Sequence, residues 1–169
     1  MTSLVFDTDV LSTFGKIKRL DLLEKLFPGA NFSIPASVNN ELFKAKDCGY
    51  EFVDYITDSR IFEVILLRQE ELVFLEKLHD ERRKLGPGEL ECISICKHRD
   101  SVLVTNDTAV KKVCYHYDIK FIDLSMLLKS LVVTDILTSK EVKALMDEIE
   151  DKDKVIISNA DYILNSNDL

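Results

Sequence analysis

The stretch from Leu4 to Leu11, with the sequence LVFDTDVL, constrains this chain more than any other. Three apolar residues run into Asp7, which is the pattern of a buried strand that delivers its next side chain to the carboxyl edge of a parallel sheet. Ligands bind at that edge in open α/β folds. Asp9 falls in the turn or first helical turn behind it. Two carboxylates in one small space favour a bound cation, because their like charges repel.

Length and composition indicate one domain with an appendage. With 169 residues, 46% of them apolar, the chain can bury one good core but is too short for two ordinary domains. No apolar run approaches the ~20 residues of a membrane helix, and the first strand begins too early to leave room for a signal peptide. We therefore expect a cytoplasmic protein with no membrane contact. Its four cysteines lack paired CxxC spacing, so we expect free thiols.

Apolar periodicity predicts strands and helices in alternation. Strands are predicted at 4–6, 31–35, 61–67, 101–104 and 120–123, and helices at 10–14, 20–27, 36–45, 50–56, 70–85, 89–96, 108–115, 125–131, 141–149 and within 155–164. This order predicts a three-layer α/β/α fold around a central parallel sheet of about four to five strands, joined by right-handed crossovers. We expect the α/β domain in residues 1–133 and an acidic helical C-terminal extension in residues 134–169.

Further carboxylates are predicted at the edge where Asp7 lies. Asp107 follows the strand at 101–104, and Glu41, Glu89 and Glu91 fall in early turns of helices that begin at the same edge. Each has an ordinary explanation: a helix cap for Asp107, dipole compensation for one of the paired glutamates, and a solvated helix face for Glu41. Separate local arguments place five acids at one edge of the sheet. Such a concentration is hard to explain if they are ordinary surface residues.

A carboxylate cluster without cysteine or histidine ligands suits Mg²⁺ or Mn²⁺ rather than zinc. The three histidines are scattered, and the chain has neither a glycine-rich phosphate loop nor a GxSxG elbow. Acidic sites that hold divalent ions typically hydrolyse phosphate esters, because the ion generates a hydroxide and stabilises the leaving oxygen. The pattern therefore favours metal-assisted phosphoester hydrolysis.

The net charge of −8 does not exclude a phosphate-bearing substrate. Residues 134–169 hold nine acidic and four basic residues, so much of the excess lies in the extension. Without the six carboxylates considered for the site, residues 1–133 hold 18 basic and 15 acidic residues. Bound divalent ions would cancel much of the charge of the site itself.

Four segments resemble, in order and spacing, the four acidic motifs of a PIN domain, the nuclease fold of VapC-type toxins. They are VFDTDVLS, PASVNNELFKA, LGPGELECISIC and VLVTNDTAVKKVC, and the resemblance covers roughly residues 1 to 130. The tail, with ILTSKEVKALMDEIE and VIISNADYIL, also resembles the C-terminal extension of prokaryotic and archaeal PIN proteins with a GE-type third motif. The resemblance implies a PIN-like fold for the predicted sheet and helices.

The resemblance also implies roles for individual residues. The four acidic positions fall on Asp7, Glu41, Glu91 and Asp107, with Thr105 as the hydroxyl that accompanies the last motif. Metal ligands are then expected among Asp7, Asp9, Glu89, Glu91 and Asp107. The third position is commonly Asp in the family, and here Glu89 competes with Glu91 for it. Asp9 stands where Asn is usual, so it either adds to metal binding or caps the helix.

The function implied by the resemblance is a Mg²⁺- or Mn²⁺-dependent endoribonuclease that acts on single-stranded or looped RNA. A role as the toxin of a toxin–antitoxin pair, an antitoxin partner and a homodimer follow from the same analogy. Candidates for basic edges along which an RNA backbone could lie are Lys16, Lys18, Arg82, Arg83, Lys97, Arg99, Lys111 and Lys112. Among these, we expect substrate contacts first from Arg82, Arg83, Lys111 and Lys112.

Two other functions fit parts of the pattern. A phosphatase of the haloacid dehalogenase type would use Asp7 as a nucleophile that forms an aspartyl-phosphate. Its first motif has the same aspartate pair, but the segment Thr105-Asn106-Asp107 is a poor substitute for its late acidic pair. A PIN-like module that binds RNA or protein without cutting is the other alternative, and an assay for metal-dependent RNA cleavage separates it from the nuclease.

Overall fold

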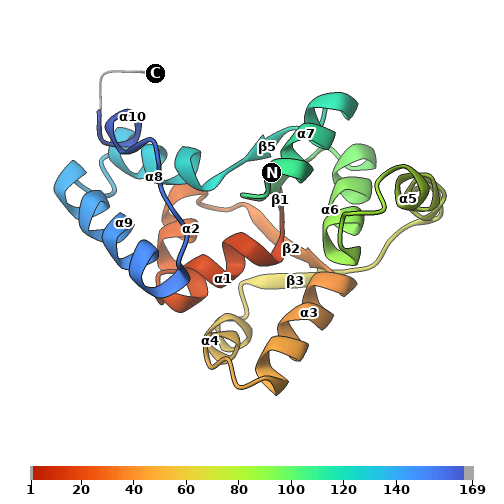
Figure 1. Cartoon of the computed structure of the whole chain (residues 1–169), viewed down its shortest axis with the longest axis horizontal. Helices are drawn as coiled ribbons and strands as arrows, with labels where there is room; N and C mark the ends of the chain where they lie inside the picture. Colours follow the sequence, from red (N-terminus) through yellow and green to blue (C-terminus); the bar gives the residue numbers. More distant parts are fainter. Residues whose placement is uncertain (1, 166–169) are drawn as a thin grey trace.

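The computed structural model describes residues 2–165 and contains a five-stranded parallel sheet between helices (Figure 1). The strands are β1 (Ser3–Phe6), β2 (Asn31–Pro35), β3 (Phe62–Ile65), β4 (Ser101–Val104) and β5 (Phe121–Ile122). Their order in the sheet is β3-β2-β1-β4-β5, and all four neighbouring pairs are parallel. The predicted α/β fold with a parallel sheet is confirmed.

Helices follow each of the strands along the chain. They are α1 (Thr8–Lys16), α2 (Asp21–Leu26), α3 (Ala36–Asp47), α4 (Phe52–Ser59), α5 (Gln69–Glu81), α6 (Pro87–His98), α7 (Thr108–Tyr117), α8 (Leu124–Val133), α9 (Ser139–Asp153) and α10 (Ala160–Leu164). Figure 1 shows α1, α2, α8 and α9 on one side of the sheet and α5 and α6 on the other. None of the helices in residues 2–165 is long and apolar enough to cross a membrane.

The central strand β1 is buried on both faces. Leu4, Val5 and Phe6 have no exposed surface. The ring of Phe6 packs against Phe32 of β2 and Phe62 of β3, with both centroid distances at 5.2 Å. A parallel strand covered on both sides reads as a continuous apolar run, which explains why the first strand was easy to predict.

The order of the strands places the ends of β1 and β4 side by side. The chain adds β2 and β3 on one side of β1 and then returns to add β4 on the other side. This reversal is a topological switch point, which is where ligands bind in open α/β sheets. The pairing continues one residue beyond β1, because the N–H of Asp7 donates to the carbonyl of Val104 at 3.0 Å.

The ends of most predicted elements differ from the observed ones by a few residues, as three cases illustrate. The first helix begins at Thr8 rather than residue 10, because the carboxylate of Asp7 caps it. The predicted strand 61–67 is only Phe62–Ile65, an edge strand whose next residue, Leu66, is 73% exposed. The predicted helix 70–85 ends at Glu81, so the basic run 82–84 lies beyond the helix and not in its last turn.

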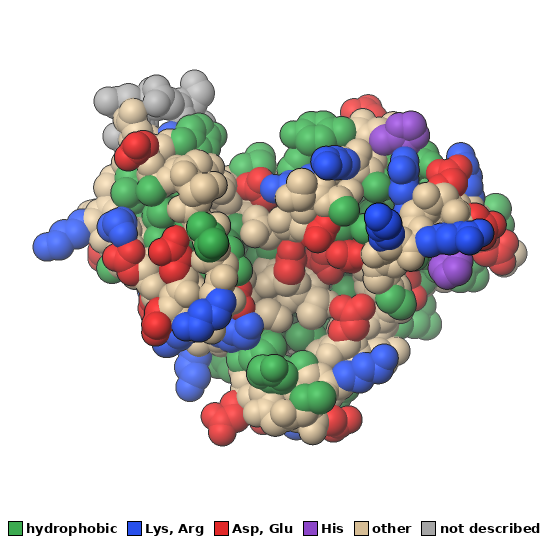
Figure 2. All heavy atoms as spheres, in the orientation of Figure 1, with side chains coloured by type: hydrophobic (Ala, Val, Ile, Leu, Met, Phe, Trp, Pro, Cys, Tyr) green, Lys and Arg blue, Asp and Glu red, His purple; other side chains and the backbone are tan. Residues whose placement is uncertain are grey.

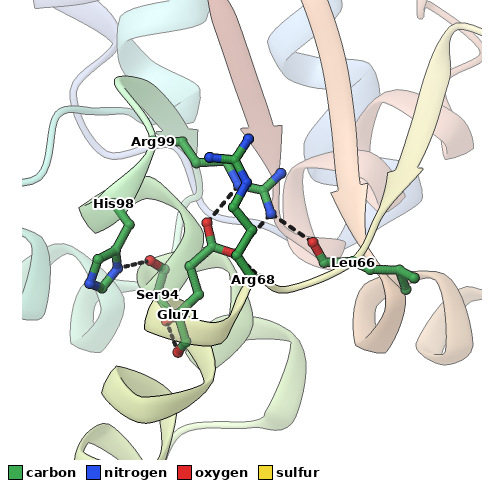
Figure 3. A network of polar contacts seen from close by, with 6 residues as sticks. All are labelled: Leu66, Arg68, Glu71, Ser94, His98 and Arg99. Carbon is green, nitrogen blue, oxygen red and sulfur yellow. Dashed lines mark hydrogen bonds and ion pairs between the residues drawn. The ribbon is translucent and has the colours of Figure 1, made fainter.

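A buried ion pair fixes the start of α5 against α6 (Figure 3). Glu71 has no exposed surface, and its carboxylate accepts hydrogen bonds from Arg99 Nε at 2.6 Å and Arg99 Nη2 at 2.8 Å. Burial alone would raise the pKa of Glu71, but the hydrogen bonds from Arg99 and from the N–H of Arg68 lower it. Ser94 of α6 donates to the carbonyl of Glu71 at 2.6 Å, so the network holds α6 in place beside the sheet.

The C-terminal helices pack on α1 and α8. Asp153, at the end of α9, accepts hydrogen bonds from Thr13 Oγ1 and Lys16 Nζ of α1. Lys129 of α8 is 4% exposed. Its Nζ donates to the backbone carbonyl of Tyr162 at 2.9 Å and lies 4.5 Å from the centre of the Tyr162 ring. Apolar residues of α9 belong to the same core as the sheet, namely Val142, Leu145, Met146 and Ile149. The division at residue 133 stays a prediction.

Candidate functional site

An acidic pocket lies where the carboxyl ends of β1 and β4 meet the starts of α1, α6 and α7. It has a volume of about 480 Å³ and is lined by Asp7, Thr8, Asp9, Glu41, Gly86, Glu89 and Asp107. Figure 2 shows acidic side chains gathered in a hollow near the middle of this face, with basic side chains on the surrounding lobes. The lining contains no lysine or arginine, so its negative charge has no basic partner inside the pocket.

Asp7 is the most deeply placed of these acids, with 4% of its surface exposed. Its Oδ1 accepts a hydrogen bond from the N–H of Thr8 at 2.7 Å, and its Oδ2 accepts one from Thr105 Oγ1 at 3.0 Å. Burial and the charge of Asp9 nevertheless raise the pKa of Asp7 to about 7. A carboxylate that holds its proton so tightly lacks a positive partner, and a bound cation would supply one.

Asp9 bridges the first turn of α1 and the segment after β4. Its Oδ1 accepts a hydrogen bond from the N–H of Val10 at 2.6 Å, and its Oδ2 accepts one from the N–H of Asn106 at 2.8 Å. Burial raises the pKa of Asp9, and the charge of Asp107 adds to this effect. Asp9 therefore lines the pocket and also joins the two strand ends.

Glu41 reaches the pocket from the second turn of α3. Its carboxylate accepts hydrogen bonds from Thr8 Oγ1 and, at 3.2 Å, from the N–H of Gly88. A Cβ at Gly88 would lie 2.8 Å from Glu41 Oε1 and 3.0 Å from Val38 Cγ2. A Cβ at this position would force Glu41, Val38 or α6 to shift, so the GPG segment at the start of α6 allows α3 and α6 to lie this close.

The two glutamates of α6 lie in different surroundings. Glu89 lines the pocket, and its carboxylate accepts a hydrogen bond from the N–H of Gly86 at 2.7 Å. Burial raises the pKa of Glu89, and the charges of Asp107, Asp9 and Glu41 raise it further. These charges place Glu89 within the electrostatic reach of three other acids.

Glu91 is not among the residues that line the pocket. Its Oε2 accepts a hydrogen bond from the N–H of Ser37 at 2.9 Å, and its Oε1 accepts one from Ser37 Oγ at 2.7 Å. Ser37 lies in the first turn of α3, where N–H groups have no partner inside the helix. The structure thus brings Glu89 into the pocket and places Glu91 at the start of α3.

Asp107 and Thr105 complete the arrangement after β4. Asp107 caps α7, with its Oδ1 accepting hydrogen bonds from the N–H groups of Ala109 at 2.6 Å and Val110 at 2.9 Å. Thr105 is fully buried; it donates to Asp7 and accepts a hydrogen bond from the N–H of Asp107 at 3.2 Å. Thr105 therefore fixes the ends of β1 and β4 relative to each other.

The basic candidates divide into two groups. Lys16, Lys97 and Arg99 are engaged within the chain, with Asp153, the carbonyl of Tyr117 and Glu71 respectively. Lys18 lies between α1 and α2, away from the lining of the pocket. Arg82, Arg83 and Lys112 line a hollow beside the start of α7, and Lys111 forms an ion pair with Asp123 at 3.0 Å. The second group therefore lies on or beside α7, the helix that Asp107 caps.

The chemistry of the pocket fits a hard divalent cation, because its donors are carboxylate oxygens. Burial, together with the repulsion of neighbouring carboxylates, raises the pKa values of Asp7, Asp9 and Glu89, and a bound cation would stabilise their charged forms. Within residues 2–165, no group of three or more histidine, cysteine, aspartate and glutamate side chains is already arranged to hold an ion. Cation binding would therefore require small rotations of these carboxylates.

Sequence reasoning did not include Thr8 in the site. Its hydroxyl donates to Glu41, and its N–H donates to Asp7, so it links two of the acids. The available signal was its position between the first two carboxylates, at the predicted strand end. The glycines beside Pro87 entered the sequence analysis only as part of the segment LGPGELECISIC.

A parallel α/β sheet with a pocket of carboxylates at its topological switch point defines the class of this protein. A family model described as PIN domain matches residues 3–163. The chain therefore belongs to the PIN domain family. The matched range includes α9 and nearly all of α10, so the C-terminal helices are covered by the same model.

Among solved structures, the chain is similar to a chain in the structure of VapBC-1 from nontypeable Haemophilus influenzae. The sequence identity is 16% and the TM-score is 0.55, over 72% of this chain and 98% of that chain. At this identity the similarity shows a shared fold alone. No curated protein matches the sequence. The predicted resemblance to a PIN domain is confirmed.

Proposed function

We propose that this protein is an endoribonuclease that hydrolyses RNA phosphodiester bonds with Mg²⁺ or Mn²⁺ in the acidic pocket. The observation that carries the proposal is the pocket itself: it has five carboxylates and no basic side chain, and it lies at the switch point of a PIN domain. Membership of this family sets aside the phosphatase alternative.

The residues have separate tasks in this proposal. The cation would be held by Asp7, Asp9, Glu89 and Asp107. Glu41 would add a further negative charge on the α3 side of the pocket. When bound, the cation supplies an activated water and stabilises the charge that develops on the phosphate. Thr105 keeps Asp7 oriented through its hydrogen bond at 3.0 Å. Glu91 acts indirectly in this scheme, because it fixes the start of the helix that carries Glu41.

Single-stranded or looped RNA is the proposed substrate. An open pocket of about 480 Å³ can admit a sugar-phosphate backbone, and the unpaired bases of such RNA can splay out onto neighbouring surfaces. Arg82, Arg83, Lys111 and Lys112 are proposed to contact phosphates outside the pocket. These contacts would offset the repulsion between the acids and the RNA until a cation is bound.

Cleavage of single-stranded RNA with and without Mg²⁺ or Mn²⁺ tests the proposal. We expect fragments only with the cation, and we expect Asp7→Asn to reduce the rate at least 100-fold, since it removes a charged ligand from the centre of the site. Asp58→Asn, an exposed aspartate outside the pocket, is the control and should cleave normally. A wild-type protein that cleaves no RNA with either cation would replace the nuclease with the binding module.

We also propose an antitoxin partner and a homodimer. The support is the similarity to a chain of a structure described as VapBC-1, together with the family match. Coexpression with the protein encoded by a neighbouring gene, followed by size-exclusion chromatography with light scattering, tests both. A chain that stays monomeric and that the neighbouring protein does not inhibit would contradict this part of the proposal.

A further inference from the structure

A second hollow, of about 620 Å³, lies along α7, the helix that Asp107 caps at the acidic pocket. Its apolar surface comes from Cys114, Tyr115, Ile119, Phe121 and Met126, and its basic side chains are Lys111, Lys112 and Lys120. An apolar surface with a basic rim is suited to a ligand that is both aromatic and anionic. We call this space the α7 hollow.

The spacing of residues on α7 connects the hollow to the acidic pocket. Thr108, Lys111, Lys112 and Tyr115 follow the i, i+3, i+4, i+7 pattern of one helix face, and all four line the α7 hollow. Thr108 is the residue immediately after Asp107. At 1.5 Å per helical residue, Tyr115 lies about 12 Å along the helix from Asp107, which is within reach of a neighbouring nucleotide.

Tyr115 is unusually open for an aromatic residue, with 76% of its surface exposed. Phe121 of β5 packs perpendicular to the ring, with the centroids 5.2 Å apart and the planes at 89°. Met126, which is 43% exposed, lies in the same lining. A ring with this much exposed surface and one perpendicular neighbour keeps a face free for stacking, and nucleobases stack on such faces in proteins that bind single strands.

The lysines beside this ring differ in their availability. The side chain of Lys112 forms no ion pair or hydrogen bond with any of residues 2–165. Lys111 is paired with Asp123, and Lys120 has only a loose exposed pair with Asp100 at 3.6 Å, which contributes little. Asp118 and Asp123 also line the hollow, so Lys112 is the main free charge for an anion there.

Lys112 also lines the next hollow, on the other side of α7. Arg82, Arg83 and Lys84 line that hollow together with Asp80 and Glu81. The two hollows together carry six basic and four acidic side chains, in a chain with a net charge of −8. The ridge of α7 is therefore a local basic region beside an acidic pocket, which suits a phosphate backbone that passes from one to the other.

We infer that the α7 hollow is a nucleotide subsite for the RNA strand whose cleavage we propose: a base next to the scissile phosphate stacks on Tyr115, and Lys112 binds its phosphate. The inference rests on the proposed function for its substrate class. A peptide would need an aromatic and an acidic side chain next to each other to use both the aromatic face and the lysines, whereas every nucleotide carries a base and a phosphate.

RNA binding measured without cleavage tests the subsite. A fluorescein-labelled single-stranded RNA of mixed sequence is titrated with protein in EDTA, and the affinity is read from anisotropy. Tyr115→Ala should weaken binding about 5- to 100-fold, and Tyr115→Phe should restore most of it, because the ring and not the hydroxyl makes the stack. Tyr50→Ala removes a ring that is 55% exposed and lies outside both hollows, and it should bind like the wild type.

A tryptophan probe reports stacking directly, since the chain contains no tryptophan. Tyr115→Trp should lose fluorescence when RNA is added, and Tyr50→Trp should not. An RNA with abasic sites should bind the wild type more weakly than intact RNA does, and this difference should shrink in Tyr115→Ala. Lys112→Gln should lower the slope of log affinity against log salt by about 0.7, the value for one phosphate contact on a single strand.

The outcomes separate this inference from the nuclease proposal. If Tyr115→Ala binds RNA as well as the wild type and Tyr115→Trp shows no quenching, the subsite is overturned even if the wild type cleaves RNA. If stacking is observed but no cation yields cleavage, the subsite stands and the nuclease proposal falls. A wild type that binds no single-stranded RNA overturns the subsite as well.

Discussion

The burial of Asp7 lowers the stability of the cation-free fold at high pH, although the proposed chemistry requires this buried carboxylate. Its pKa is raised to about 7 by burial and by Asp9, against about 3.9 in an unfolded chain. Between these values the folded state binds the proton more tightly than the unfolded state does. Proton binding by Asp7 therefore contributes fully to the free energy of unfolding below about pH 4, and this contribution is lost as the pH rises through about 7. A site that destabilises the cation-free fold is common where function requires uncompensated charge.

We predict from this that the cation-free protein becomes less stable between pH 5 and pH 8. Asp7→Asn should be more stable than the wild type at pH 8, on the order of 2 kcal/mol, because it removes the buried charge. Thermal unfolding in EDTA at several pH values measures both effects. Added Mn²⁺ should stabilise the wild type at pH 8 but have less effect on the variant. A variant with the same pH dependence as the wild type would contradict this account.

The positions of Glu89 and Glu91 lead to opposite predictions for the same substitution on one helix. Glu89→Gln should weaken Mn²⁺ binding and cleavage while leaving stability unchanged or higher, because Glu89 carries surplus charge in the pocket. Glu91→Gln should cost about 1–2 kcal/mol of stability, because it loses charge-assisted hydrogen bonds to Ser37. Its Mn²⁺ affinity should stay close to that of the wild type. Calorimetric titration and thermal unfolding of both variants decide which glutamate faces the cation.

At the residue scale the sequence predicted that Asp7 and Asp107 lie at the sheet edge, because Asp7 directly follows one apolar strand and Asp107 comes three residues after the end of another. It could not distinguish Glu89 from Glu91. Two residues on a helix point about 200° apart, so the choice depends on where α6 begins and on how closely it approaches α3. That approach depends on Gly88 and on the start of α3, and the start of α3 is far from Glu91 in sequence.

At the scale of elements, the close contact between α3 and α6 determines the shape of the pocket. We predict that Gly88→Ala costs about 1–3 kcal/mol of stability and lowers cleavage, because the new Cβ would lie 2.8 Å from Glu41 Oε1 and force Glu41 or α6 to move. Gly86→Ala is the matched control, since its nearest atom would be Glu89 Oε2 at an ordinary 3.7 Å. Denaturant unfolding and cleavage rates test this. Equal effects of the two substitutions would show that the close approach does not matter.

Sheet, helix order and most helix positions were predictable, because apolar periodicity is a local property. The errors concern the ends of elements, where contacts with residues distant in the sequence determine where a strand or helix stops. The strand ends at Ile65 because β3 is an edge strand and Arg99 takes the carbonyl of Leu66. The helix ends at Glu81 although the apolar period continues to Leu85. The buried ion pair of Glu71 and Arg99 could not be predicted from the sequence, because the two residues are 28 positions apart.

At the scale of the whole molecule, the question is whether residues 134–169 are an appendage or part of one folding unit. Ile149 of α9 is fully buried in the core cluster that includes the sheet residues. Ile149→Ala should therefore cost about 2–4 kcal/mol in a single unfolding transition and should lower the hydrogen-exchange protection of β1 amides as well as those of α9. Lys152→Ala, on the exposed face of the same helix, should change neither. If α9 instead loses protection alone, the division predicted at residue 133 is a true domain boundary, and the proposed site would survive removal of the tail.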